Sequence, residues 1–116
     1  MEQPEFLEQH VFTDLKNLNE GFAENPVYYF SEEDFEIVLQ RIEYFGIGIY
    51  KIETLSNNEL IDNSTHDDFN KKATDCRWYK KAFSTFKTRQ SKLYYTATYK
   101  VSNKLLARQK TPNNNE

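Results

Sequence analysis

The sequence predicts an α+β fold in which a small antiparallel or mixed sheet has helices packed on one face. Segments with helical periodicity alternate with segments in which apolar residues recur at every second position. The expected order is helix, strand, helix, strand, strand, helix, strand, which is a ferredoxin-like order with an extra N-terminal helix. Because 116 residues suffice for only one core, we expect a single domain over 1–108 and a disordered C-terminal tail over 109–116.

The first two predicted elements are a helix over residues 5–20 and a strand over residues 27–30. Gly21 is the expected helix stop, and Asn25-Pro26 separates the two elements. The strand is short, aromatic and β-branched. The helix is indicated by apolar residues at spacings of four, four and three: Leu7, Val11, Leu15 and Leu18.

The second predicted helix has the clearest boundaries in the chain. Ser31 is suited to the N-cap, Asp34 follows three residues later, and Gly46 is suited to the stop. Its apolar residues share one face: Phe35, Val38, Leu39, Ile42 and Phe45.

The remaining elements follow from alternation, turn residues and one further amphipathic pattern. Asp75 is suited to cap a helix that reaches about Arg89. Residues 105–107 fit either a return strand or a short helix begun by Ser102. The other expected elements are a strand over 47–53, a turn at 56–58, a strand over 59–62, a helical or turn segment over 66–73 and a strand over 93–101. For the last segment a competing helical pattern of Ala97, Val101 and Leu105 leaves a helix open.

Charge is divided unevenly along the chain. Residues 1–68 contain 16 acidic and three basic residues, a net charge of −13, whereas residues 69–116 contain two acidic and 12 basic residues, a net charge of +10. Such an asymmetry suggests a polyanionic partner for the basic half. It is also explained by an acidic half that folds against the basic half, and the sequence leaves both explanations open.

The helix over 75–89 carries the predicted partner-binding residues. Cations occupy the side opposite its apolar face, where they could neutralise phosphates or carboxylates, and aromatic residues nearby could stack on bases. We therefore predict a non-enzymatic binding domain for nucleic acid or an acidic protein surface. The predicted partner-binding residues are Arg77, Lys80, Lys81 and Lys87 on this side, with Trp78 and Arg89 at its margin.

No motif for catalysis, metal binding or cofactor binding is present. The two histidines, His10 and His66, lie far apart, Cys76 falls on an apolar face, and the three glycines form no phosphate-binding loop. We expect no catalytic residues, no metal and no cofactor. An enzyme with a small-molecule pocket lined by Tyr and Phe and one or two carboxylates remains an alternative.

Self-association is the other alternative, and the expected compartment is the cytoplasm. No apolar run approaches the roughly 18 residues that span a bilayer, and the acidic start of the chain does not resemble a secretory signal. The single cysteine gives no reason to expect an oxidising compartment. A homo-oligomer interface would use apolar residues outside the main helical stripes: Ile37 and Tyr44 with Phe6 or Phe12.

Overall fold

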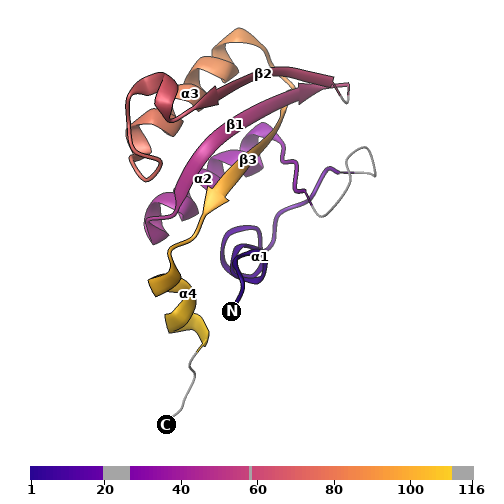
Figure 1. Cartoon of the computed structure of the whole chain (residues 1–116). Helices are drawn as coiled ribbons and strands as arrows, with labels where there is room; N and C mark the ends of the chain where they lie inside the picture. Colours follow the sequence, from indigo (N-terminus) through magenta and orange to yellow (C-terminus); the bar gives the residue numbers. More distant parts are fainter. Residues whose placement is uncertain (20–26, 58, 111–116) are drawn as a thin grey trace.

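The two long helices begin and end where the sequence predicts. The computed structural model describes residues 1–19, 27–57 and 59–110 (Figure 1). Helix α2 spans Glu32–Phe45, with the Ser31 hydroxyl accepting a 3.2 Å hydrogen bond from the Asp34 N–H. It ends at Gly46, whose φ of 69° lies in the left-handed region that glycine tolerates best. The predicted N-cap and stop are both confirmed.

Helix α3 spans Cys76–Arg89 and is capped by Asp75, whose carboxylate accepts from the Arg77 N–H at 2.9 Å. This cap satisfies one of the N–H groups that a helix start leaves without an intrahelical partner. The side chains that α3 buries lie on one side of the helix: Trp78, Tyr79, Ala82, Phe83 and Phe86.

Three strands form an antiparallel sheet in the order β2-β1-β3 (Figure 1). Tyr95 of β3 is fully buried, and its ring stacks 5.2 Å from Phe35 of α2 and meets Phe83 of α3 edge-on at 5.1 Å. The core therefore lies between one face of the sheet and the two helices, and the α+β class is confirmed. The strands are β1 (Gly48–Ser56), β2 (Glu59–Thr65) and β3 (Tyr94–Lys100).

The predicted helix over 5–20 is confirmed only up to Val11, and residues 12–19 are not helical. Helix α1 covers only Gln3–Phe6 and continues as a π-helical turn, η1, over Leu7–Val11. The backbone beyond it bonds to another segment, because the Leu18 N–H donates to the Tyr29 carbonyl at 2.7 Å and the Asn17 side chain accepts from the Tyr29 N–H at 3.0 Å. These bonds replace the helical ladder that the leucine spacing predicted.

The predicted strand over 27–30 is wrong. Phe30 alone pairs with the sheet, exchanging two 2.8 Å backbone hydrogen bonds with Tyr95. Tyr29 has already turned toward Asn17 and Leu18. The ferredoxin-like order requires four strands, and the described residues form three, so this finer prediction is not confirmed.

The later boundaries differ from the predictions by a few residues. β1 and β2 each run three residues further than expected, and the added residues of β1 include a register irregularity at Thr54/Leu55 that interrupts its alternation. The segment over 66–73 contains only the short helix η2, Asp67–Phe69. Helix α4, Asn103–Lys110, decides for the helical alternative, since the Ser102 hydroxyl accepts from the Leu105 N–H at 3.1 Å. Gly21, Asn25-Pro26 and residues 111–116 of the predicted tail lie outside the described residues.

Candidate functional site

The predicted cations all reach the surface of α3, and three of them pair with carboxylates of this chain. We call Arg77, Lys80, Lys81, Lys87 and Arg89 the α3 basic face. Arg77 pairs with Asp75, Lys80 with Glu43 and Arg89 with Asp62, each at 2.7 Å. Glu43 and Asp62 belong to the acidic half, so the two halves of the chain meet here.

These pairs also determine the titration of the carboxylates. Hydrogen bonds from Arg77 lower the pKa of Asp75 from 3.8 to about 2. The hydrogen bond from Lys80 likewise lowers the pKa of Glu43. Both carboxylates are therefore ionised at neutral pH and offset the charge of the cations beside them.

Trp78 is separated from the basic face. It is 1% exposed, its ring lies 5.7 Å from Phe69, and its indole N–H donates to the Ala73 carbonyl at 3.4 Å. Lys81 is exposed, and the Lys87 ammonium lies 4.6 Å above the Phe83 ring. Neither lysine pairs with a carboxylate of the described residues. The structure thus leaves five of the six predicted residues at the surface of α3 and places the sixth in the core.

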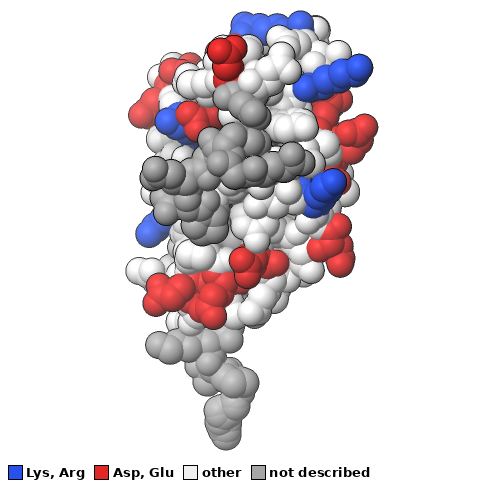
Figure 2. Space-filling model, turned by 90° about the vertical axis from the view of Figure 1, so that its right-hand side faces the viewer, with Lys and Arg blue, Asp and Glu red and all other residues white. Residues whose placement is uncertain are grey.

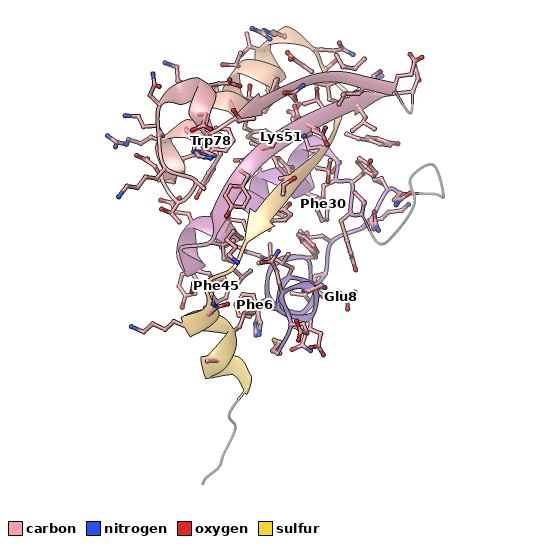
Figure 3. All side chains as sticks on the ribbon, in the orientation of Figure 1. Phe6, Glu8, Phe30, Phe45, Lys51 and Trp78 are labelled. Carbon is pink, nitrogen blue, oxygen red and sulfur yellow. The ribbon has the colours of Figure 1, made fainter. Side chains whose placement is uncertain are left out.

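Some of the residues proposed for self-association are buried in the core and others are exposed. Phe6 is fully buried and Phe12 is 7% exposed, whereas Tyr44 is 83% exposed. Figure 3 shows Phe6 turned inward toward Phe45, with 5.2 Å between the ring centroids. The two phenylalanines therefore belong to the core and are unavailable for the expected interface.

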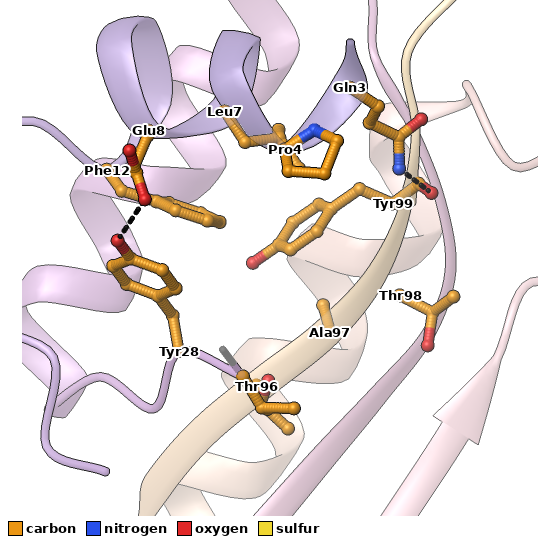
Figure 4. A pocket seen from close by; sticks show the side chains of 11 residues that line it. Gln3, Pro4, Leu7, Glu8, Phe12, Tyr28, Thr96, Ala97, Thr98 and Tyr99 are labelled. Atoms are coloured by element: carbon orange, nitrogen blue, oxygen red, sulfur yellow. Dashed lines mark hydrogen bonds between the residues drawn. The ribbon is translucent and has the colours of Figure 1, made fainter. Parts of the chain in front are cut away.

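A second candidate site lies between the N-terminal helical segment and the edge of β3 (Figure 4). We call it the β3-edge pocket. It has a volume of about 320 Å³, within the range of about 300–1,000 Å³ that is usual for small-molecule sites. Its lining is mainly apolar and aromatic: Gln3, Pro4, Leu7, Glu8, Phe12, Val27, Tyr28, Thr96, Ala97, Thr98 and Tyr99.

The pocket exists because the chain leaves β3 after a single pair. A continued strand would place Tyr28 opposite Ala97, two residues beyond the Phe30–Tyr95 pair. Instead the Tyr28 hydroxyl reaches Glu8, and the Tyr28 ring packs 4.5 Å from Phe12. The space beside Ala97 is left to the pocket.

The polar groups of the pocket include two tyrosine hydroxyls that differ in their hydrogen bonding. The Tyr28 hydroxyl donates to Glu8 Oε2 at 3.1 Å, and burial together with this hydrogen bond raises the pKa of Tyr28. The Tyr99 hydroxyl is inaccessible and has no hydrogen-bond partner among the described residues, and burial raises the pKa of Tyr99. Both phenols therefore stay protonated at neutral pH.

The lining contains no paired nucleophile and base. Glu8 is its one ionisable carboxylate, and His, Cys and Lys do not occur in it. Across residues 1–19, 27–57 and 59–110, no three His, Cys, Asp or Glu side chains gather as metal ligands. Cys76 is a free thiol on α3, with its Sγ 3.5 Å from Glu43 Oε2. The arrangement can bind a ligand by burial and hydrogen bonding.

Sequence reasoning missed this pocket. Phe12 was expected on a long helix and Tyr28 in a strand, and no spacing in the sequence links either residue to Tyr99. An aromatic pocket with one carboxylate was nevertheless the form that the small-molecule alternative anticipated. What the sequence lacked was a signal that the segment 27–30 would leave the sheet.

Comparison of the chain with protein-family models, with curated proteins and with solved structures finds no match. Within the part of the chain that the structure describes, no helix has both the length and the apolar character needed to cross a membrane.

Proposed function

We propose that this chain is a non-catalytic binding domain that takes an apolar side chain of a partner into the β3-edge pocket. The observation that carries the proposal is the aromatic lining, in which Phe12 lies 4.5 Å from Tyr28 and 5.6 Å from Tyr99. Apolar concavities with a few placed polar groups are the usual form of a ligand site. Burial of an apolar group there supplies affinity, and the hydroxyls and Glu8 supply orientation.

The rim of the pocket favours a basic partner. Glu8 lies at the pocket, and Glu2 and Glu5 belong to the same N-terminal segment, in which the first Lys or Arg is Lys16. Figure 2 views the side of the molecule that carries α1 and shows acidic side chains gathered in its lower part. We further propose a cytoplasmic location, which the single free Cys76 supports.

The proposal is tested with two small probes on the ¹⁵N-labelled chain. N-acetylphenylalanine amide should shift the amide signals of Leu7, Ala97 and Tyr99 and leave those of β2 unchanged. N-acetylglycine amide, which has the same amide groups without the ring, should shift none of them. Equal responses to both probes, or none to either at millimolar concentration, would overturn the proposal.

Two variants locate the binding. Tyr28→Ala removes one wall of the pocket, and we expect it to weaken binding of N-acetylphenylalanine amide at least several-fold. Tyr50→Ala removes a tyrosine that is 42% exposed and lies outside the pocket, so it should leave the affinity unchanged. Equal affinity in the two variants would place the binding elsewhere.

The α3 basic face supports a second candidate function, the binding of an acidic partner. The observation that favours this function is that Lys81 and Lys87 have no carboxylate partner among the described residues. If the carboxylates mask this face, a Glu43→Gln, Asp62→Asn double variant should elute from heparin at higher salt than the unmodified chain. Lys81→Ala should lower the eluting salt concentration, and Lys51→Ala, on the sheet, should not. Retention that does not depend on salt would exclude this candidate.

A further inference from the structure

The edge of β3 is paired at both ends and open between them. At one end Tyr95 exchanges both of its backbone hydrogen bonds with Phe30. At the other end the Gln3 side-chain amide takes the place of a neighbouring strand. Its Nε2 donates to the Tyr99 carbonyl at 3.1 Å, and its Oε1 accepts from the Val101 N–H at 2.9 Å.

The open stretch between these ends centres on Ala97. In an antiparallel ladder, the N–H and C=O groups of every second residue point to the same side. Because Tyr95 faces Phe30, the backbone groups of Ala97 also face this edge, and so does the Tyr99 N–H. Among the described residues, no hydrogen bond to these groups is formed from the side of the pocket.

An edge with free N–H and C=O groups is a template for one further strand. Four residue steps separate Tyr95 from Tyr99, or about 13 Å at about 3.3 Å per residue. This length admits about three extended residues between the Phe30 bridge and the Gln3 amide. A longer strand would have to displace Gln3.

We propose that the partner of the β3-edge pocket is an extended peptide that adds to β3 by pairing one residue with Ala97. This inference rests on the proposed function and names its ligand class. An amide group supplies both the donor and the acceptor that the backbone of Ala97 requires, and the adjoining aromatic lining receives an apolar side chain. The Glu8 carboxylate, beside the pocket, selects a peptide with a neighbouring Lys or Arg by charge complementarity.

The test uses the tripeptide acetyl-Lys-Phe-Lys-amide and its counterpart with a methylated Phe nitrogen. With the unmethylated tripeptide, hydrogen exchange of the Ala97 amide should slow, while that of exposed amides of β2 should not. Methylation removes the peptide donor and should weaken binding by about three- to tenfold, the usual effect of one net hydrogen bond. The same two tripeptides with leucine in place of phenylalanine test whether the pocket accepts an aliphatic side chain instead.

A charge variant separates the contribution of the acidic rim. Glu8→Gln should weaken tripeptide binding and reduce its dependence on salt. Glu59→Gln, on the opposite edge strand, is the matched control and should change neither. Equal responses of the two variants would remove the proposed preference for a basic partner.

The outcomes distinguish the two levels of the proposal. If N-acetylphenylalanine amide binds but neither tripeptide binds more tightly or slows exchange at Ala97, strand addition is wrong and the pocket proposal stands. If no probe binds, the pocket proposal fails and strand addition fails with it. If methylated and unmethylated tripeptides bind equally, the ligand uses the pocket without pairing to β3.

Discussion

The α3 basic face and the β3-edge pocket leave different groups unsatisfied. On α3, three exposed cations have carboxylate partners at 2.7 Å, and water reaches the remaining charges. At the pocket, the Tyr99 hydroxyl is inaccessible and has no described partner, and the backbone of Ala97 faces an open edge. Most of the charges on α3 therefore have partners, whereas the Tyr99 hydroxyl and the edge-facing backbone groups of Ala97 have none among the described residues.

This difference shows why charge composition is a weak guide to a binding surface. Exposed charges are hydrated, and pairing them with neighbours changes the free energy of folding little. A fold can therefore place acidic and basic residues side by side without a functional reason. Backbone N–H and C=O groups are strongly driven to pair, so an open strand edge beside an apolar pocket is the more specific sign of a partner.

The largest expected effect tests whether Trp78 belongs to the core or to the basic face. Trp78→Ala should lower the free energy of unfolding by about 3–5 kcal/mol, the usual result of truncating a buried aromatic side chain. Urea denaturation followed by circular dichroism measures this change. Lys81→Ala, on the exposed side of the same helix, should change it by less than about 0.5 kcal/mol. Similar small changes in the free energy of unfolding of both variants would contradict the burial of Trp78.

A smaller effect is expected at Ser31, where the chain passes from the Phe30 bridge into α2. Ser31→Ala removes the hydroxyl that accepts from the Asp34 N–H and should lower the free energy of unfolding by about 1 kcal/mol. Urea denaturation measures it, and Ser31→Asp, which keeps a capping oxygen, should restore most of the loss. A loss that Ser31→Asp does not restore would mean that the cap is not the cause.

The tyrosines of the pocket should respond in opposite directions to loss of the hydroxyl. Tyr99→Phe removes a buried hydroxyl without a described partner and should raise the free energy of unfolding by up to about 1 kcal/mol. Tyr28→Phe removes a hydrogen bond to Glu8 and should lower it slightly. Urea denaturation of both variants makes the comparison. A clear loss of stability in Tyr99→Phe would show that its hydroxyl has a partner after all.

The smallest effect concerns the α3 basic face and depends on pH. The folded pKa of Asp75 is about 2, below its ordinary value of 3.8, so its ionised form stabilises the fold above pH 3.8. This contribution is lost as the pH falls toward 2. Asp75→Asn keeps a capping oxygen without the charge, so the stability difference between the two chains should shrink over that interval. Urea midpoints from pH 6 to pH 2 measure it, and a constant difference would contradict the role of the Arg77 pair.

Local signals explain which parts of the fold were predictable. Helices α2 and α3 have capping residues at their starts, and their apolar faces are regular, so the sequence predicts them closely. The N-terminal region also has a regular apolar pattern, but its backbone hydrogen bonds go to Tyr29. The spacing of apolar residues does not show whether backbone groups will form helical hydrogen bonds or bond to a segment distant in the sequence. The β3-edge pocket arises from the same competition and was missed for the same reason.

The sequence by itself determined the α+β class, the positions of α2 and α3, and the exposure of the cations on α3. These depend on periodicity and capping, which act over a few neighbouring residues. Only the tertiary structure decided that Glu43 and Asp62 compensate that surface, that Trp78 is buried, and that β3 keeps an open edge beside a pocket. Each of these depends on which distant groups meet, because charges, rings and strand edges are satisfied by whatever the fold places next to them.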